Sequence, residues 1–146
     1  MLVHGTCVAI DGQGVLLRGP SGAGKSDLAL RLIDAGAVLV ADDQVEIAAE
    51  DAKMLARPPE TLAGLLEVRG LGIVTLAYRA PVPLLLVIDL APSDQIDRLP
   101  EPATAQLCGI AMPLLRIDPF TASAPAKIRF AVAVAAGKGG SIMRPR

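Results

Sequence analysis

The sequence is poor in aromatic side chains: its 146 residues include two phenylalanines, one tyrosine and no tryptophan. Apolar residues nevertheless make up 52% of the chain, so the core must be built from alanine, valine, leucine and isoleucine. Such a core suits a sheet that is covered by helices. The same shortage means that very few side chains could stack on a nucleobase.

Cysteine and net charge are also low. Cys7 and Cys108 are the only cysteines, and they are too few and too unpatterned for a disulfide framework or a zinc site. We expect both to be small buried hydrophobes. The formal net charge is −1, which is not the basic footprint of a nucleic-acid-binding domain.

Long apolar runs are missing as well. The longest, Leu84 to Leu90, is far shorter than the roughly 20 residues that a membrane-spanning helix needs. No charged segment followed by an apolar stretch opens the chain, so no secretory signal is predicted. We therefore expect a soluble, cytoplasmic protein with neither a membrane nor a nucleic acid as its partner.

One segment carries the strongest functional signal. It fits the pattern G-x-x-x-x-G-K-[ST] of a phosphate-binding loop and consists of Gly19, Pro20, Ser21, Gly22, Ala23, Gly24, Lys25 and Ser26. The glycines let the backbone turn tightly and bring its N–H groups against phosphate oxygens. Lys25 supplies a flexible positive charge for the outer phosphates, and the Ser26 hydroxyl is suited to bind Mg²⁺.

The flanking sequence supports this interpretation. Residues 14–18 form a short apolar run that predicts a strand, and residues 27–34 have the apolar spacing of a helix. The start of that helix adds a partial positive charge to the anion site. A glycine-rich turn that matches the pattern by chance is the alternative. We predict that the protein binds a nucleoside triphosphate.

The residues before the loop predict an antiparallel hairpin. Residues 2–10 are rich in valine, threonine and isoleucine, and Asp11-Gly12 is a turn signal before the next strand. In most phosphate-loop folds the strand before the loop belongs to a parallel sheet. An antiparallel hairpin at this place therefore indicates an atypical phosphate-loop fold. His4 lies near the start of this hairpin, where spacing alone favours an ordinary surface histidine.

A second apolar strand, predicted over residues 37–41, ends in Asp42 and Asp43. Apolar strands often end in solvated acids simply because a loop begins there. Two adjacent carboxylates closely downstream of a phosphate loop are better explained by Mg²⁺ binding and proton transfer. In an extended chain neighbouring side chains point to opposite sides, so one acid could face the γ-phosphate while the other faces the metal or supports Lys25.

The remaining pattern completes a single α/β domain over residues 1–146. Gly36 is placed to end the first helix, and Pro125 suits the first turn of a second helix over residues 126–136. The other predicted elements are strands at 45–47, 73–74, 83–90 and 114–117, loops at 51–59 and 97–100, and a short helix at 60–66. The basic, glycine-rich residues 138–146 are predicted to form a flexible tail.

Taken together, these segments resemble the catalytic domain of HPr kinase/phosphorylase. The matching segments are His4-Gly5, 19–26, 39–43 and 66–73, with weaker matches at 97–99 and 125–129. A phosphate loop alone is generic, whereas the A-D-D strand combined with the E-x-R-G-L-G-I segment at 67–73 is specific. The resemblance covers nearly the whole chain.

The resemblance implies a bifunctional enzyme. Members of that family use ATP to phosphorylate a serine of the phosphocarrier protein HPr, a phosphotransferase-system component, and they reverse this with inorganic phosphate to release pyrophosphate. Their fold is an atypical phosphate-loop kinase domain of the α/β class with a mixed sheet, related to phosphoenolpyruvate carboxykinase. The expected partner here is HPr or its nitrogen-related paralogue, and we expect a homo-oligomer.

The resemblance also implies roles for individual residues. The catalytic positions of the family are matched by His4, Lys25, Asp42, Asp43 and Arg98, and its Mg²⁺ ligands by Ser26 and Glu67. The family pattern favours Asp43 as the base. Lys127 and Arg129 fall in a basic segment near the family's active site. Pro20 departs from the pattern, which commonly has an acid there, and the family's long form carries a further N-terminal domain.

Two other functions are left open by the residues. Leu84 to Asp89 resembles a Walker-B strand, an apolar strand that ends in an acid. If it is one, the protein is an ordinary small-molecule kinase or ATPase with Asp89 as the metal ligand. The acids at 42 and 43 argue against this, because they already supply carboxylates. A nucleotide-sensing module that binds a partner without transferring phosphate is the second alternative. The full set of acids, His4 and Arg98 argues against that one.

Overall fold

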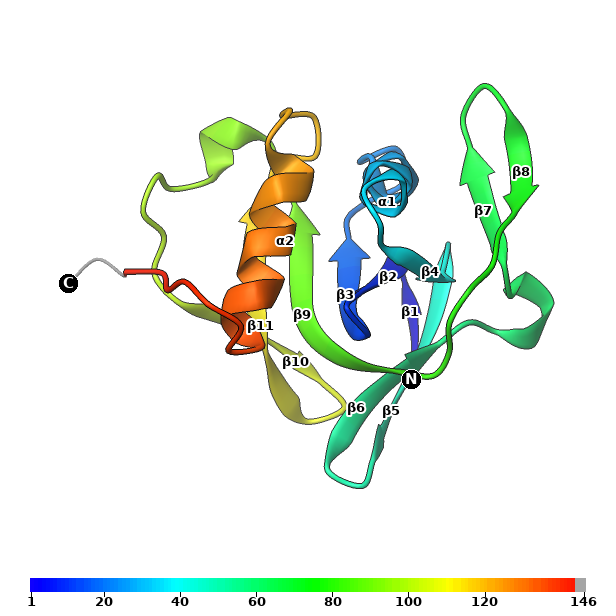
Figure 1. The fold of residues 1–146 in the computed structure, drawn as a ribbon, viewed down its shortest axis with the longest axis horizontal. Helices are drawn as coiled ribbons and strands as arrows, with labels where there is room; N and C mark the ends of the chain where they lie inside the picture. Colours follow the sequence, from blue (N-terminus) through cyan, green and yellow to red (C-terminus); the bar gives the residue numbers. More distant parts are fainter. Residues whose placement is uncertain (144–146) are drawn as a thin grey trace.

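The computed structural model describes residues 1–143, which form a mixed α/β fold (Figure 1). The strands are β1 (Leu2–His4), β2 (Thr6–Ile10), β3 (Gln13–Arg18), β4 (Val38–Ala41), β5 (Gln44–Glu50), β6 (Lys53–Arg57), β7 (Leu65–Val68), β8 (Gly72–Thr75), β9 (Val82–Leu90), β10 (Ala103–Leu107) and β11 (Ile110–Ile117). The helices are α1 (Lys25–Asp34) and α2 (Ala124–Ala135), with short 3₁₀ helices η1 (Glu60–Leu62) and η2 (Ser93–Gln95). No helix among the described residues is long and apolar enough to cross a membrane.

The main sheet is mixed, as the sequence predicts. Its strands follow the order β1-β5-β6-β9-β3-β2-β4, and the antiparallel β10–β11 pair joins it through β11 and β9. β3 and β11 both run parallel to β9, while β2 is antiparallel to its neighbours β3 and β4. The parallel strands therefore end at one edge of the sheet, and the loop that follows β3 lies at this edge (Figure 1).

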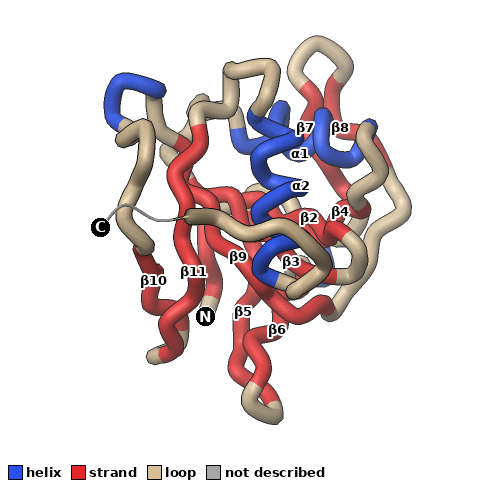
Figure 2. The backbone as a smooth tube through the Cα atoms, turned by 60° about the vertical axis from the view of Figure 1, so that its left-hand side comes forward, coloured by secondary structure: helices blue, strands red, loops and turns tan. Residues whose placement is uncertain are grey.

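Alternating side chains of β3 pack into two separate cores. Val15 and Leu17 face the helices, where they join Leu28 and Leu32 of α1 and Ile128 of α2 in one buried cluster. The residue between them points to the other face, into a second cluster whose buried members all come from strands. Both helices therefore lie on the same face of the central strands, and the sheet curls around the second core (Figure 2).

The predicted strand at 2–10 is two strands, because the chain bends at Gly5. β1 pairs with β5, whereas β2 lies between β3 and β4. A side-chain carbon at position 5 would lie 2.8 Å from the backbone oxygen of Leu17, so glycine is required there. The Gly5 N–H donates to the Asp43 carbonyl at 3.1 Å. The bend thus brings both His4 and Thr6 to the acids that follow β4.

Three further elements differ from the sequence prediction. The expected loop at 51–59 contains β6, in which Met54 and Ala56 are buried while the residues between and beside them are not. The expected helix at 60–66 is only the single turn η1, because Gly64 takes φ +77° and β7 begins at the next residue. The sequence pattern does not indicate β10, which pairs with β11 across a turn at Cys108-Gly109.

The two cysteines lie in different environments. Cys7 is fully buried, and burial raises the pKa of its thiol to about 12. Cys108 is exposed on the β10–β11 turn, so the prediction that both are buried is wrong for this one. In the segment predicted to be a flexible tail, residues 138–143 have no helix or strand, and residues 144–146 lie outside the described residues.

Candidate active site

The predicted phosphate loop connects β3 to α1 at the edge where the parallel strands end. Gly22 and Gly24 have φ angles of +81° and +101°, which L side chains rarely adopt. Gly24 is the N-cap of α1, and it has no side chain that could cap the first N–H groups of the helix. These N–H groups are thereby left open to an anionic ligand.

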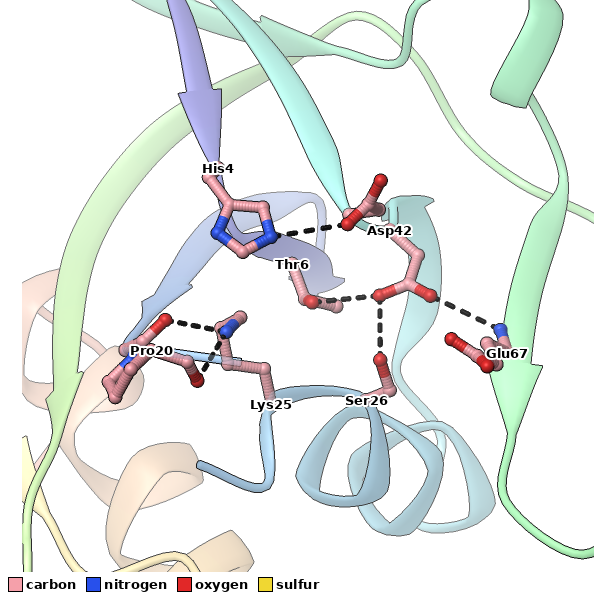
Figure 3. Close-up of polar contacts among 9 residues, drawn as sticks. His4, Thr6, Pro20, Lys25, Ser26, Asp42 and Glu67 are labelled. Atoms are coloured by element: carbon pink, nitrogen blue, oxygen red, sulfur yellow. Dashed lines mark hydrogen bonds and ion pairs between the residues drawn. The ribbon is translucent and has the colours of Figure 1, made fainter. Parts of the chain in front are cut away.

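Lys25 begins α1, and its side chain folds back over the loop (Figure 3). Its Nζ donates to the carbonyl of Gly19 at 2.5 Å and to that of Pro20 at 3.0 Å. Only 8% of this residue is exposed. Burial lowers the pKa of the ammonium, while the carboxylates of Asp42 and Asp43 act to raise it. The cation is therefore held at the loop and within the field of both acids.

Asp42 joins three elements of the fold. Only 7% of it is exposed, and its carboxylate accepts hydrogen bonds from Thr6 Oγ1 at 2.8 Å and Ser26 Oγ at 2.9 Å (Figure 3). A third bond comes from the backbone N–H of Glu67 at 3.2 Å. These donors belong to β2, α1 and β7. The structure thus connects the first predicted acid directly to the last residue of the phosphate-loop motif.

Asp43 has a different environment. Its side chain is 64% exposed, and its Oδ1 lies 3.2 Å from Nε2 of His4, which is itself 53% exposed. The backbone of Asp43 has φ +70°, a conformation that aspartate tolerates better than most residues. The two carboxylates therefore point to different places, one into the fold and one into solvent.

Glu67 lies on β7, which forms a hairpin with β8. Figure 3 shows its side chain pointing from the strand toward Ser26 and Asp42. The neighbouring Leu66 is fully buried and holds the hairpin against the body of the fold. Side-chain oxygens from α1, β7 and the end of β4 therefore gather at one point beside the loop.

Arg98 is not brought to this group. It lines a cavity of about 760 Å³ along β11 and α2, which Lys127 also lines, and no residue of the phosphate loop lines that cavity. Arg129, the other residue of the predicted basic segment, is exposed on α2. The catalytic role expected for Arg98 stays a prediction, for which the observed geometry provides no mechanism.

Asp89, the alternative metal ligand, is already paired. Its two carboxylate oxygens accept hydrogen bonds from Nε and Nη2 of Arg18 at 2.8 and 3.1 Å. The two residues face each other across the parallel pair β3–β9. A metal ion at Asp89 would have to displace this two-point guanidinium contact, so the geometry favours the acids at 42 and 43.

Thr6 is a site residue that sequence reasoning missed. Its side chain is fully buried, and the hydroxyl donates to Asp42. The available signal is a single hydroxyl residue at the start of an otherwise apolar, wholly buried strand. A buried hydroxyl needs a partner, but the sequence does not reveal that the partner lies 36 residues away.

Comparison with known proteins identifies the family. A family model for the HPr serine kinase C-terminal domain matches residues 1–136. The chain belongs to this family. It is 47% identical to the HPr kinase/phosphorylase of Geobacillus sp. (strain WCH70) over 108 residues, which is 66% of this chain and 35% of that protein. The HPr kinase/phosphorylase of Lactobacillus acidophilus is 36% identical over 127 residues, which is 79% of this chain and 39% of that protein.

The chain thus spans little more than a third of the length of these curated relatives. Among solved structures, the Hpr(Ser) kinase/phosphatase from Coxiella burnetii is similar over 94% of this chain and 92% of that one, with a TM-score of 0.83 and 27% sequence identity. The resemblance to the family and the mixed α/β fold, both predicted from the sequence, are therefore confirmed.

Proposed function

We propose that this chain transfers the γ-phosphoryl group of ATP to a serine of HPr or of its nitrogen-related paralogue. In the reverse process it uses inorganic phosphate to remove that group, which restores the serine and releases pyrophosphate. The observation that carries this proposal is the acid pair beside the loop: Asp42 accepts a bond from Ser26, while Asp43 is exposed and paired with His4. Further support comes from the relatives, which are called HPr kinase/phosphorylase and Hpr(Ser) kinase/phosphatase.

The proposal extends to the class of fold and the setting. We assign the chain to the atypical phosphate-loop kinase domains related to phosphoenolpyruvate carboxykinase, supported by the antiparallel β2–β3 hairpin that feeds the loop. A homo-oligomer is supported by exposed apolar side chains such as Leu71 and Ile73, which are 79% and 70% exposed on the β7–β8 hairpin. The compartment we propose is the cytoplasm, as the sequence predicts.

The loop binds the phosphates in this proposal. The open N–H groups at the start of α1 and the helix dipole attract the anion. When phosphate binds, Lys25 Nζ leaves the carbonyls of Gly19 and Pro20 and donates to phosphate oxygens instead. The new bonds to a charged acceptor compensate for the two that are lost. Phosphoryl transfer depends mainly on such positioning and charge stabilisation.

The residues beside the loop fit a magnesium ion. Mg²⁺ prefers oxygen ligands and is usually held by one or two protein groups together with substrate phosphates and water. The Ser26 hydroxyl and the Glu67 carboxylate are the ligands we assign, with Asp42 next to them. Among the described residues no cluster of three His, Cys, Asp or Glu could hold a metal by itself, which agrees with a site completed by substrate. The ion, when bound, neutralises charge on the phosphate oxygens.

Asp43 is the proton-transfer group. The serine hydroxyl of the substrate gives its proton to Asp43 while its oxygen bonds to the γ-phosphorus and the bond to the leaving oxygen of ADP breaks. In the reverse direction an oxygen of inorganic phosphate attacks the phosphorus, and Asp43 returns the proton to the departing serine oxygen. His4, 3.2 Å from Asp43, holds this exposed carboxylate in position. Asp42 is buried and already accepts three bonds, so it positions Ser26 and Glu67 instead.

The test is to incubate the protein with Mg²⁺, γ-labelled ATP and either HPr or the nitrogen-related paralogue. Label on a serine of one of these proteins is the expected result. Label on a small molecule or free phosphate, lost in Asp89→Asn but kept in Asp43→Asn, would instead identify an ordinary kinase or ATPase. Binding of ATP with no transfer at all would identify a nucleotide-sensing module.

A further inference from the structure

The few aromatic side chains lie in three separate places. The chain has one tyrosine and two phenylalanines. Tyr78 lies against Gly64, and Phe130 of α2 lies against Gly140. Phe120 alone lies at the phosphate loop: a side-chain carbon on Gly24 would be 3.2 Å from its ring and 3.3 Å from the ring of Pro119. Phe120 is nevertheless 73% exposed, so one of its surfaces faces solvent beside the loop.

The turn that carries Phe120 is held by a set of hydrogen bonds. It connects β11 to α2, beside the loop that precedes α1 (Figure 1). The Asp118 carboxylate accepts from the Phe120 N–H at 2.9 Å and from the Ser93 hydroxyl at 2.6 Å, and the Ser93 bond is the main cause of the lowered pKa of this carboxyl. Arg31 of α1 donates to the Pro119 carbonyl. The backbone that carries the ring is thus held both to α1 and to Ser93, which lies in the segment that follows β9.

Phe120 and the acids lie on opposite sides of the loop. In the sheet, β4, which leads to Asp42, lies beyond β2 on one side of β3. β9 and then β11, which leads to Phe120, lie on the other side. On α1 itself, Ser26 faces Asp42 while Arg31 faces the turn with Phe120. A triphosphate whose terminal group lies at the acids and whose chain crosses the start of α1 therefore has its nucleoside end at Phe120.

We propose that Phe120, backed by Pro119, is the platform on which the purine base of the nucleoside triphosphate stacks. The inference rests on the proposed function, because it assumes that the loop binds a triphosphate with its terminal phosphate at the acids. Base–aromatic stacking needs a fixed ring with an accessible face and tolerates different bases, since every base has a π-face. Among the described residues, which include all three aromatic side chains of the sequence, Phe120 is the one that lies against the loop.

The experiment compares two ligands that differ in the base. Calorimetry with Mg²⁺ measures the dissociation constants of ATP and of inorganic tripolyphosphate for the unaltered chain, Phe120→Ala, Phe120→Tyr and Phe130→Ala. Phe120→Ala is expected to weaken ATP binding roughly tenfold to a hundredfold, the range that loss of one stacked base produces. Tripolyphosphate binding stays unchanged, and Phe120→Tyr retains ATP affinity. Phe130→Ala, a phenylalanine away from the loop, leaves both ligands unaffected and serves as the matched control.

The outcomes separate this inference from the proposed function. Equal affinity of the unaltered chain for ATP and tripolyphosphate, or an unchanged ATP affinity in Phe120→Ala, overturns the stacking platform and leaves the phosphate loop intact. An equal loss for both ligands also overturns it, because Phe120 would then act only on the shape of the loop. Binding of neither ligand by the unaltered chain overturns the proposed function together with the platform. Circular dichroism confirms that each variant is folded.

Discussion

Replacing Asp42 by alanine removes the shared acceptor of three donors. The Thr6 hydroxyl is fully buried, and the Glu67 N–H and the Ser26 hydroxyl are partly buried. A hydrogen bond to a charged group contributes about 1.5–3 kcal/mol, and a buried donor left without a partner loses its hydration as well. Burial of the carboxylate in the folded protein costs hydration free energy, and the alanine variant no longer has this cost. This gain offsets part of the loss of the three hydrogen bonds. We therefore expect the free energy of unfolding to fall by about 3 kcal/mol.

Two further variants make this a test of geometry. In Asp42→Asn the amide oxygen can accept from the Glu67 N–H while the amide nitrogen donates to the hydroxyl oxygens of Thr6 and Ser26. The free energy of unfolding of Asp42→Asn should therefore fall by less than about 1 kcal/mol. Asp43→Asn removes only an exposed pairing with His4, worth about 0–1 kcal/mol, and asparagine tolerates the positive φ at this position.

Urea unfolding followed by circular dichroism measures all three variants against the unaltered chain. A total stability of about 5–15 kcal/mol leaves Asp42→Ala folded enough to be measured. We expect Asp42→Ala to lose much more free energy of unfolding than either Asp42→Asn or Asp43→Asn. Losses of the same size in Asp42→Ala and Asp43→Asn would refute the reasoning, because Asp42 would then not join β2, α1 and β7 in the folded protein.

Other predictions follow from single residues or surfaces. Ser26→Ala should weaken binding of Mg·ATP roughly tenfold while leaving metal-free ATP binding unchanged, and calorimetry that finds Mg·ATP affinity unaltered would remove Ser26 as a metal ligand. At mildly alkaline pH a thiol reagent should label only Cys108 in the folded chain, because burial keeps the raised-pKa thiol of Cys7 protonated and inaccessible; rapid labelling of both would contradict the buried position. Sedimentation at roughly tens of micromolar should detect self-association, and a strictly monomeric protein would argue against the proposed oligomer.

The parts of the site that the sequence predicts are those encoded by neighbouring residues. The phosphate loop is contiguous, and its glycines are needed locally for positive φ at 22 and 24. The acids at 42 and 43 end a strand whose apolar run is visible in the sequence. Alternation in an extended chain predicts that the two acidic side chains point in different directions, and they do. Asp43 is not extended, however, and its left-handed backbone conformation is the cause.

The parts that the sequence does not predict depend on distant pairings. At the bend, the nearby carbonyl of Leu17 leaves no room for a side chain on Gly5. The bend decides that His4 meets one acid and Thr6 the other. β6 and β10 are short strands with polar or exposed residues at alternate positions, so their apolar signal is weak and their pairing partners decide the outcome. The separate position of Arg98 depends on where its loop packs, which no local pattern encodes.

The measurement that tests the central claim most directly is the rate in both directions for the double variant Asp42→Asn with Asp43→Asn. Phosphorylation of the HPr serine by ATP and dephosphorylation by inorganic phosphate are followed separately, and ATP binding is measured alongside. Each rate should fall roughly 10²–10⁴-fold, the usual contribution of a positioned proton-transfer group, while ATP still binds at the loop. Near-normal rates in either direction would contradict the account, because the acids beside the phosphate loop would then not perform the chemistry.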